Sequence, residues 1–205
     1  MKTIGLIGGM SWESTQTYYQ ILNETVRERL GGLHSARCIL YSVDFAEVEA
    51  LQHQGRWEEA AALLTGAASA LESAGAGCIV LCTNTMHKVA GQIEAGVSIP
   101  LLHIADAAAG PIRARGLQTV GLLGTRFTME EDFYKKRLID RHGLNVLTPA
   151  PEERTLVHRV IYDELCLGQI RSASREAYRR IIKGLVERGA QGIILGCTEI
   201  GLLIK

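Results

Sequence analysis

The chain has few aromatic residues, no excess of either charge and no long apolar run. Only 5% of its 205 residues are aromatic although 47% are hydrophobic, which is typical of an Ala/Leu/Ile-rich α/β core. The 22 basic and 22 acidic side chains balance, and no basic stripe indicates a nucleic acid partner. No apolar run reaches membrane-spanning length, and the N-terminus lacks a signal peptide, so we expect no membrane association and a cytoplasmic location.

The cysteines do not have the spacing of a metal site. There are five, an odd number, without a Cys-x-x-Cys pair or a His/Cys cluster of zinc type. Cys38, Cys78 and Cys166 are best interpreted as buried structural thiols, because a free cysteine behaves as a small hydrophobic residue. Cys82 and Cys197 remain as candidates for chemistry.

Short apolar runs alternate with helical patterns along the chain. The runs expected to form buried strands are Ile4–Ile7, Cys38–Val43, Cys78–Cys82, Leu101–Ile104, Val120–Leu123, Asn145–Leu147 and Ile193–Gly196. Helical periodicity covers Ser14–Leu30, Ala46–Gln54, Trp57–Ala74, Lys88–Glu94, Ala105–Arg115, Met129–His142, Glu152–Leu167 and Ser172–Arg188. The alternation predicts an α/β protein with mainly parallel sheets that are covered on both faces.

Two kinds of helix boundary can also be predicted. Thr128-Met-Glu-Glu131 has the form of a capping box, which places a helix start at Thr128. Gly75, Gly116 and Gly189 each follow a helical pattern, where a glycine that ends a helix is common.

The second half of the chain resembles the first. Thr3-Ile-Gly-Leu-Ile-Gly-Gly9 aligns with Thr119-Val-Gly-Leu-Leu-Gly-Thr125, and Gly75–Thr85 aligns without a gap with Gly189–Glu199. The second alignment sets Thr83 opposite Cys197. We therefore expect two pseudo-symmetric parallel-sheet α/β domains, residues 1–98 and 99–205, with the active site in the cleft between them.

Four segments follow strands at the edge where α/β proteins bind ligands. They are Gly8-Gly-Met-Ser11, Cys82-Thr-Asn-Thr85, Gly124-Thr-Arg126 and Gly196-Cys-Thr-Glu199. All are small or rich in hydroxyls, which suits backbone amides that bind a carboxylate or a phosphate. The first is neither a dinucleotide fingerprint nor a P-loop, so a tight strand-to-helix turn is the favoured interpretation.

Cys197 is the strongest candidate for a reactive group. A following helix N-terminus could lower the pKa of its thiol, and only the thiolate is a good base; the alternative is a buried, inert cysteine. Thr83 aligns with Cys197, and because side chains alternate along a strand, Cys82 should face the packing behind it. The alternative for Thr83 is a helix N-cap. Three further polar residues near strand ends could support a neighbouring catalytic group, but a satisfied histidine or a helix cap is the favoured interpretation of each; they are His87, His103 and Asp106.

Three motifs carry a family resemblance. Cys82-Thr-Asn-Thr-Met-His87 and Gly196-Cys-Thr-Glu199, with Gly8-Gly-Met10, resemble the signatures of the cofactor-independent aspartate/glutamate racemases, closest to the bacterial L-aspartate/glutamate-specific branch. The resemblance covers essentially the whole chain. It implies an amino-acid substrate, a homodimer, and neither pyridoxal phosphate nor a metal. The substrate contacts that it implies are Met10, Gln52, Asn84, Thr85, Thr125, Thr198 and Glu199.

The chain departs from this family pattern in two places. Thr83 stands where the family has its first catalytic cysteine, and the chain ends at Lys205 where relatives continue with another strand and helix. Either a tail is missing or the first domain lacks an element. Since a hydroxyl is far too weak an acid to form its base near neutral pH, we expect Cys197 to take the proton and L-substrates to be preferred.

Other functions remain open at this point. The superfamily that the chain resembles also includes hydantoin racemases, maleate isomerases and arylmalonate decarboxylases, which use cysteine in the same cleft, and fold alone does not separate them. A non-catalytic amino-acid binding protein would explain Thr83. A cysteine hydrolase ranks last, because no histidine motif accompanies Cys197.

Overall fold

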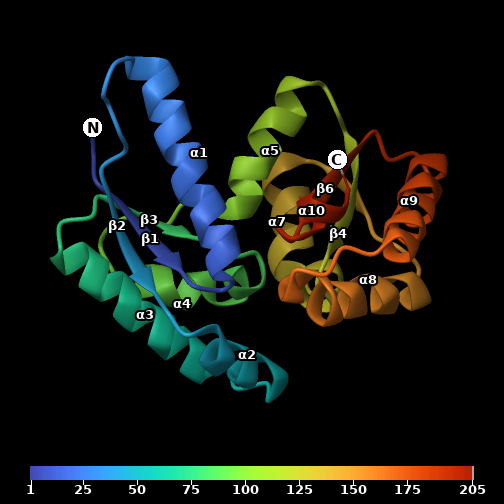
Figure 1. Cartoon of the computed structure of the whole chain (residues 1–205), viewed down its shortest axis with the longest axis horizontal. Coiled ribbons are helices and arrows are strands. Elements are labelled where there is room, and N and C mark those ends of the chain that lie inside the picture. Colours follow the sequence, from blue (N-terminus) through green and yellow to red (C-terminus); the bar gives the residue numbers. More distant parts are fainter. Residues whose placement is uncertain (205) are drawn as a thin grey trace. The chain divides into compact units, whose positions relative to one another are not determined.

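The computed structural model describes residues 1–204, which divide into two compact units (Figure 1). Unit 1 comprises Met1–His103, and unit 2 begins at Ile104. Each unit holds a three-stranded parallel sheet with flanking helices, which confirms the predicted α/β class.

The predicted strand Leu101–Ile104 is wrong. Leu101 makes only an isolated parallel bridge to Ile79, and a helix begins at Ile104. The Ile79 amide donates to the Pro100 carbonyl, and the Leu102 amide donates to the Ile79 carbonyl, both over 2.8 Å. These bonds attach the segment to unit 1, so the division at residue 103 comes later in the chain than the expected boundary after residue 98.

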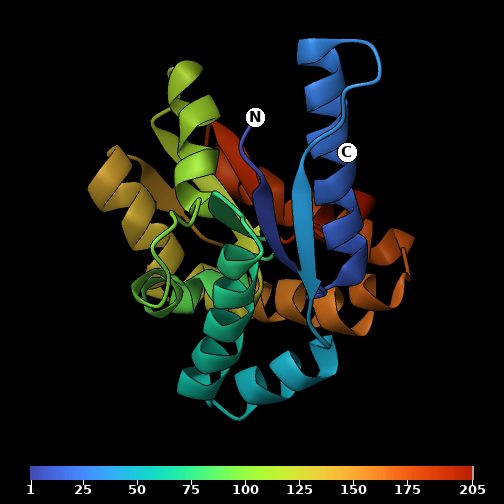
Figure 2. The same cartoon turned by 90° about the vertical axis from the view of Figure 1, so that its left-hand side faces the viewer.

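Unit 1 is built around a central first strand. Its strands are β1 (Ile4–Gly8), β2 (Cys38–Ser42) and β3 (Cys78–Leu81), in the order β2-β1-β3. Its helices are α1 (Trp12–Leu30), α2 (Phe45–His53), α3 (Trp57–Ser73), the 3₁₀ helix η1 (Thr85–Val89) and α4 (Ala90–Ala95). Helix α1 lies over one face of this sheet and α3 over the other (Figures 1 and 2). The connection from β1 to β2 and the next one, from β2 past β1 to β3, run in opposite directions across the sheet. Because such connections are right-handed, their helices cover opposite faces.

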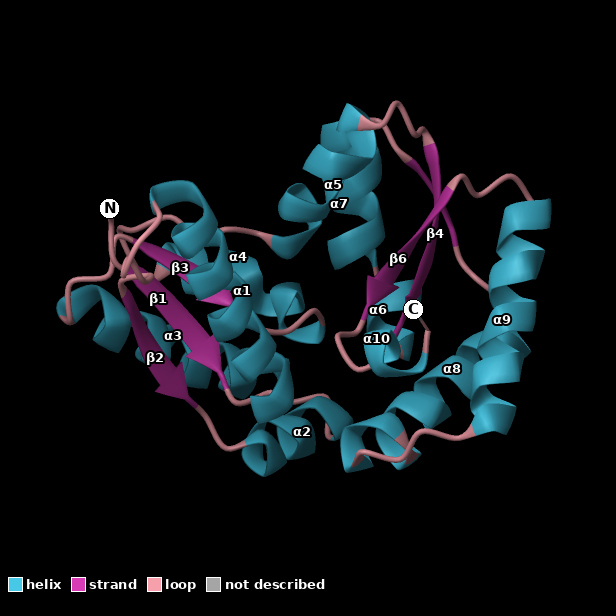
Figure 3. Ribbon diagram, turned by 45° about the horizontal axis from the view of Figure 1, so that its top comes forward, coloured by secondary structure: helices cyan, strands magenta, loops and turns pink. Residues whose placement is uncertain are grey.

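Unit 2 repeats this plan around β4. Its strands are β4 (Thr119–Gly124), β5 (Asn145–Leu147) and β6 (Gly192–Gly196), in the order β5-β4-β6. Its helices are α5 (Ile104–Ala114), α6 (Arg126–Glu130), α7 (Asp132–His142), α8 (Pro151–Asp163), the 3₁₀ helix η2 (Leu165–Leu167), α9 (Ser172–Glu187) and α10 (Ile200–Leu203) (Figure 3). Alternation along β4 builds two cores, because neighbouring side chains point to opposite faces of the sheet. Leu122 packs in the cluster of α5 and α7, whereas Leu123 packs in that of α8 and α9.

The strand register repeats between the two units, at positions that the internal alignment sets opposite each other. Gly5 pairs with Ile79 in unit 1, and the aligned Gly121 pairs with Ile193 in unit 2. A β-carbon added at Gly5 would lie 3.1 Å from Ile79 Cδ1, and one added at Gly121 would lie 2.7 Å from Ile193 Cδ1. Both units therefore use a glycine to admit the isoleucine of the adjacent strand.

Helix ends follow the predictions in part. Gly75, Gly116 and Gly189 adopt positive φ angles of 91°, 70° and 100°, which confirms them as helix terminators. The capping box at Thr128 is wrong, because the N-cap is Thr125, whose hydroxyl accepts from the Thr128 amide. The predicted helix 129–142 is interrupted at Glu131, whose backbone is extended, and the predicted helix 152–167 ends at Asp163 before η2.

Candidate active site

The turn after β1 is held by one buried threonine. Thr15 Oγ1 accepts from the Gly9 amide and donates to the Ser11 carbonyl, each over 2.9 Å. Gly9 has φ of +96°, and a β-carbon there would lie 2.2 Å from the Val43 carbonyl oxygen. Only glycine fits this position. The interpretation of Gly8-Gly9 as a tight strand-to-helix turn is therefore confirmed.

Thr83 lies in the turn that connects β3 to η1. Its amide donates to the Leu81 carbonyl over 2.9 Å, and its carbonyl lies 2.8 Å from His87 Nδ1. Thr83 is partly exposed, whereas Asn84 and Thr85 beside it are buried. Asn84, not Thr83, occupies the position before the 3₁₀ helix, so the N-cap interpretation of Thr83 is not supported.

Cys82 is buried while its neighbour Thr83 is partly exposed, which fits the expectation that Cys82 faces the packing. Its side chain is fully buried, and this burial raises the pKa of the thiol to about 12. A thiol that keeps its proton at neutral pH is a poor base and a poor nucleophile. Cys82 is therefore a structural residue.

Two further residues that are predicted to contact the substrate lie near the Thr83 turn. Gln52 on α2 is 4% exposed, and its side-chain amide donates to Met86 Sδ over 2.9 Å. Met10 packs with Met86 in the core of unit 1 and is 5% exposed. Gln52 and Met10 thus lie in the same part of unit 1 as Met86 of η1. Their contact with a substrate stays a prediction.

In unit 2, two predicted residues follow β4 and β6. Thr125 caps α6 and is buried, with its hydroxyl 3.2 Å from that of Thr128. Thr198 lies in the turn between β6 and α10, where its carbonyl accepts from the Gly201 amide. Both lie at the carboxyl edge of the sheet, where the sequence pattern places them.

Cys197 and Glu199 form the most distinctive contact of unit 2. Cys197 Sγ donates to Glu199 Oε2 over 2.9 Å, and Glu199 is 8% exposed. Burial and the adjacent Glu199 carboxylate both raise the pKa of the Cys197 thiol well above its ordinary value. The expectation of a pKa lowered by a helix N-terminus is wrong here, since α10 is short and the carboxylate acts in the opposite direction. Cys197 is therefore a neutral thiol near pH 7, and its hydrogen bond is accepted by a carboxylate.

Thr83 and Cys197 occupy equivalent positions in their units. Leu81 pairs with Ile7 in unit 1, and Leu195 pairs with Leu123 in unit 2, and these pairs match in the internal alignment. Thr83 follows Leu81, and Cys197 follows Leu195, by the same number of residues. Each unit thus presents one of the two predicted catalytic side chains after its last strand.

The chain is similar to known proteins over essentially its whole length. The sequence profile of the Asp/Glu/Hydantoin racemase family matches residues 7–205. The chain belongs to this family. A proposed Asp/Glu racemase from Yersinia pestis is 60% identical to it with a TM-score of 0.94, and the match covers 100% of this chain and 89% of that one. An aspartate racemase homologue from Pyrococcus horikoshii is 41% identical with a TM-score of 0.84, over the same shares of the two chains.

An aspartate racemase from Picrophilus torridus extends the similarity in fold alone. It is 22% identical, with a TM-score of 0.75 over 100% of this chain and 84% of that one. Membership of the Asp/Glu/Hydantoin racemase family identifies the chain as a racemase. Among residues 1–204, no three His, Cys, Asp or Glu side chains come together in a way that could hold a metal ion. Within the same part of this racemase, no helix is long and apolar enough to cross a membrane.

Sequence patterns alone did not assign two features of this racemase. The proton-acceptor contact of Glu199 was missed, although its i, i+2 spacing from Cys197 in a tight turn could have indicated it. The contact between His87 and the Thr83 backbone was also missed, because a histidine near a strand end is more often structural.

Proposed function

We propose that this racemase interconverts L- and D-aspartate or L- and D-glutamate and acts preferentially on the L-enantiomers. Cys197 removes the α-proton of the L-substrate, and the Thr83 side replaces it on the other face. The proposal requires both side chains to reach one substrate carbon. The observation that carries it is the Cys197–Glu199 pair, which gives the thiol proton a defined acceptor.

The first step follows from that pair. The thiol carries its proton in the resting protein, so it must lose it before it can act as a base. Glu199 Oε2 lies 2.9 Å from Sγ and accepts this proton, and the thiolate then takes the α-proton of the amino acid. Backbone amides at the strand ends, with Asn84, Thr85, Thr125 and Thr198, bind the α-carboxylate and stabilise the charge that develops there.

Thr83, on the second face of the substrate, makes the reaction asymmetric. A hydroxyl does not form an alkoxide near neutral pH, so Thr83 cannot remove the α-proton of a D-substrate. On the other face, Thr83 passes a proton to the carbanion while it takes one from water, or it orients a water that gives the proton directly. Activity on L-substrates is therefore expected to exceed activity on D-substrates, while the equilibrium between them is unchanged. We further propose, on the family resemblance, that the racemase is a cytoplasmic homodimer that needs neither pyridoxal phosphate nor a metal.

Chiral chromatography of reactions started from each enantiomer of aspartate and glutamate tests the proposal. We expect conversion of the L-forms, and faster use of the D-forms after Thr83→Cys. A hydantoin or a maleate turned over in place of all four amino acids would overturn the substrate assignment. Tight amino-acid binding without turnover would instead indicate a binding protein.

A further inference from the structure

We propose that His87 is a positioning residue for Thr83: its imidazole holds the Thr83 backbone and thereby fixes the Cα–Cβ bond from which the Thr83 hydroxyl projects. This role rests on the proposed function, in which Thr83 serves the second face of the substrate. It adds to that function a residue that touches neither substrate nor reacting atoms.

The backbone of Thr83 is held at both ends. Its amide donates to the Leu81 carbonyl over 2.9 Å, and its carbonyl lies 2.8 Å from His87 Nδ1. With both peptide groups held, φ and ψ of Thr83 are fixed, and with them the direction of its Cα–Cβ bond. The hydroxyl stays outside these contacts, at a partly exposed position.

The contact also defines the protonation of the ring. A carbonyl oxygen only accepts, so Nδ1 of His87 must carry a hydrogen and donate it. A side chain with a donor at the Nδ1 position can therefore replace His87 in this role, and one with a donor at the Nε2 position cannot. This difference makes the inference testable by conservative substitution.

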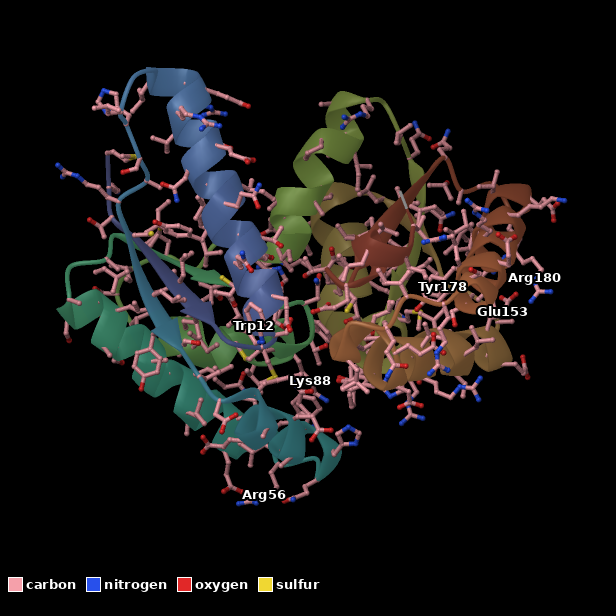
Figure 4. The ribbon with its side chains drawn as sticks, viewed as in Figure 1. Trp12, Arg56, Lys88, Glu153, Tyr178 and Arg180 are labelled. Atoms are coloured by element: carbon pink, nitrogen blue, oxygen red, sulfur yellow. The ribbon has the colours of Figure 1, made fainter. Side chains whose placement is uncertain are left out.

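Packing fixes the ring itself. His87 is 2% exposed and meets the His103 ring edge-on, with 4.6 Å between ring centroids and 64° between planes. The next residue is Lys88, which is labelled in Figure 4. Its ammonium lies 3.8 Å from the centre of the Trp57 ring on α3. Contacts on both sides thus hold η1 and the imidazole that it carries.

Unit 2 holds its catalytic turn differently. The residue that aligns with His87 is Gly201, and a β-carbon added there would meet nothing within 4 Å. The Cys197 carbonyl instead accepts from the Ile200 amide over 3.1 Å, a bond within the main chain. Of the two turns, only that of Thr83 is therefore held by an imidazole. A thiolate that takes a proton is less demanding of direction than a hydroxyl that must donate one or orient a water.

The test compares two rates on L-glutamate in D₂O: loss of the α-proton signal, and formation of the D-enantiomer. The variants are His87→Asn, whose amide nitrogen lies as many bonds from Cβ as Nδ1, His87→Gln, whose nitrogen matches Nε2, and His87→Leu. The exposed His34, replaced by leucine, is the matched control. Thermal unfolding of each variant accompanies the rates.

We expect His87→Leu and His87→Gln to lower the ratio of D-product formation to proton loss by about tenfold or more. His87→Asn should recover most of the ratio, and His34→Leu should leave it unchanged. An equal fall in both rates, or a ratio that does not move in His87→Leu, overturns the positioning role. Absence of proton loss in the wild-type racemase overturns the proposed function and this role with it.

Discussion

Replacing Glu199 by glutamine separates two explanations of how Cys197 becomes a base. The carboxylate accepts the thiol hydrogen bond over 2.9 Å and raises the pKa of Cys197, so the neutral amide should lower that pKa. If the supply of thiolate alone limited the reaction, Glu199→Gln would be faster at neutral pH. Our proposal predicts the reverse, because the amide nitrogen and oxygen cannot take up the thiol proton.

The expected loss is large and can be measured directly. A positioned general base contributes about 10²–10⁴-fold, so α-proton exchange of L-glutamate in D₂O should fall by about that factor in Glu199→Gln. Alkylation of Cys197 by iodoacetamide, followed by mass spectrometry, should meanwhile begin at lower pH than in the wild-type racemase. An exchange rate that is unchanged or raised, in protein with unaltered thermal unfolding, would refute the role of Glu199.

Three further predictions concern stability. Gly9→Ala should lower the free energy of unfolding by at least about 2 kcal/mol in urea titrations, because φ is +96° and the Val43 carbonyl lies where Cβ would be. The control is Gly66→Ala within α3, where Cβ has open space, and it should be neutral or stabilising. Burial raises the pKa of Cys82 to about 12, so the folded protein retains a thiol proton that the unfolded chain loses above pH 9.0. Stability should therefore fall as pH rises from about 9 toward 12, by up to ~1.4 kcal/mol per pH unit, and Cys82→Ala should remove this part of the slope. Tyr178 donates from α9 to the Val157 carbonyl over 3.0 Å, so Tyr178→Phe should cost about 0.5–1.5 kcal/mol in the same titrations, and an unchanged midpoint would contradict this.

The sheet plan could be predicted from the sequence because its signals are local. Short apolar runs bounded by glycine indicate β1 and β4, and the internal repeat predicts two similar units; the structure adds the matched register of Gly5 with Ile79 and Gly121 with Ile193. The segment around Leu101 was misread as a strand. Its apolar run is short and adds only one bridge to the edge of β3, and periodicity does not reveal where pairing stops.

The chemistry of the site was less accessible to sequence reasoning. A thiol at a strand end indicates a reactive cysteine, but whether its pKa is raised or lowered depends on which group the turn brings to Sγ. That group is Glu199, two residues away; the spacing makes a contact possible, and the folded turn places Oε2 2.9 Å from Sγ. The N-cap at Thr125 was likewise hard to predict. Thr125 and Thr128 both have the hydroxyl that a cap requires, and the folded backbone decides which one caps the helix.

The most direct test of the central claim is loss of the α-proton NMR signal of L-glutamate and L-aspartate in D₂O. Purified protein without pyridoxal phosphate is compared with Cys197→Ser, which keeps a hydrogen-bond donor for Glu199 but removes the thiol. Our account predicts exchange in the wild-type protein and none above background in the variant. Equal exchange in both proteins, or none in the folded wild-type protein, would contradict Cys197 as the base.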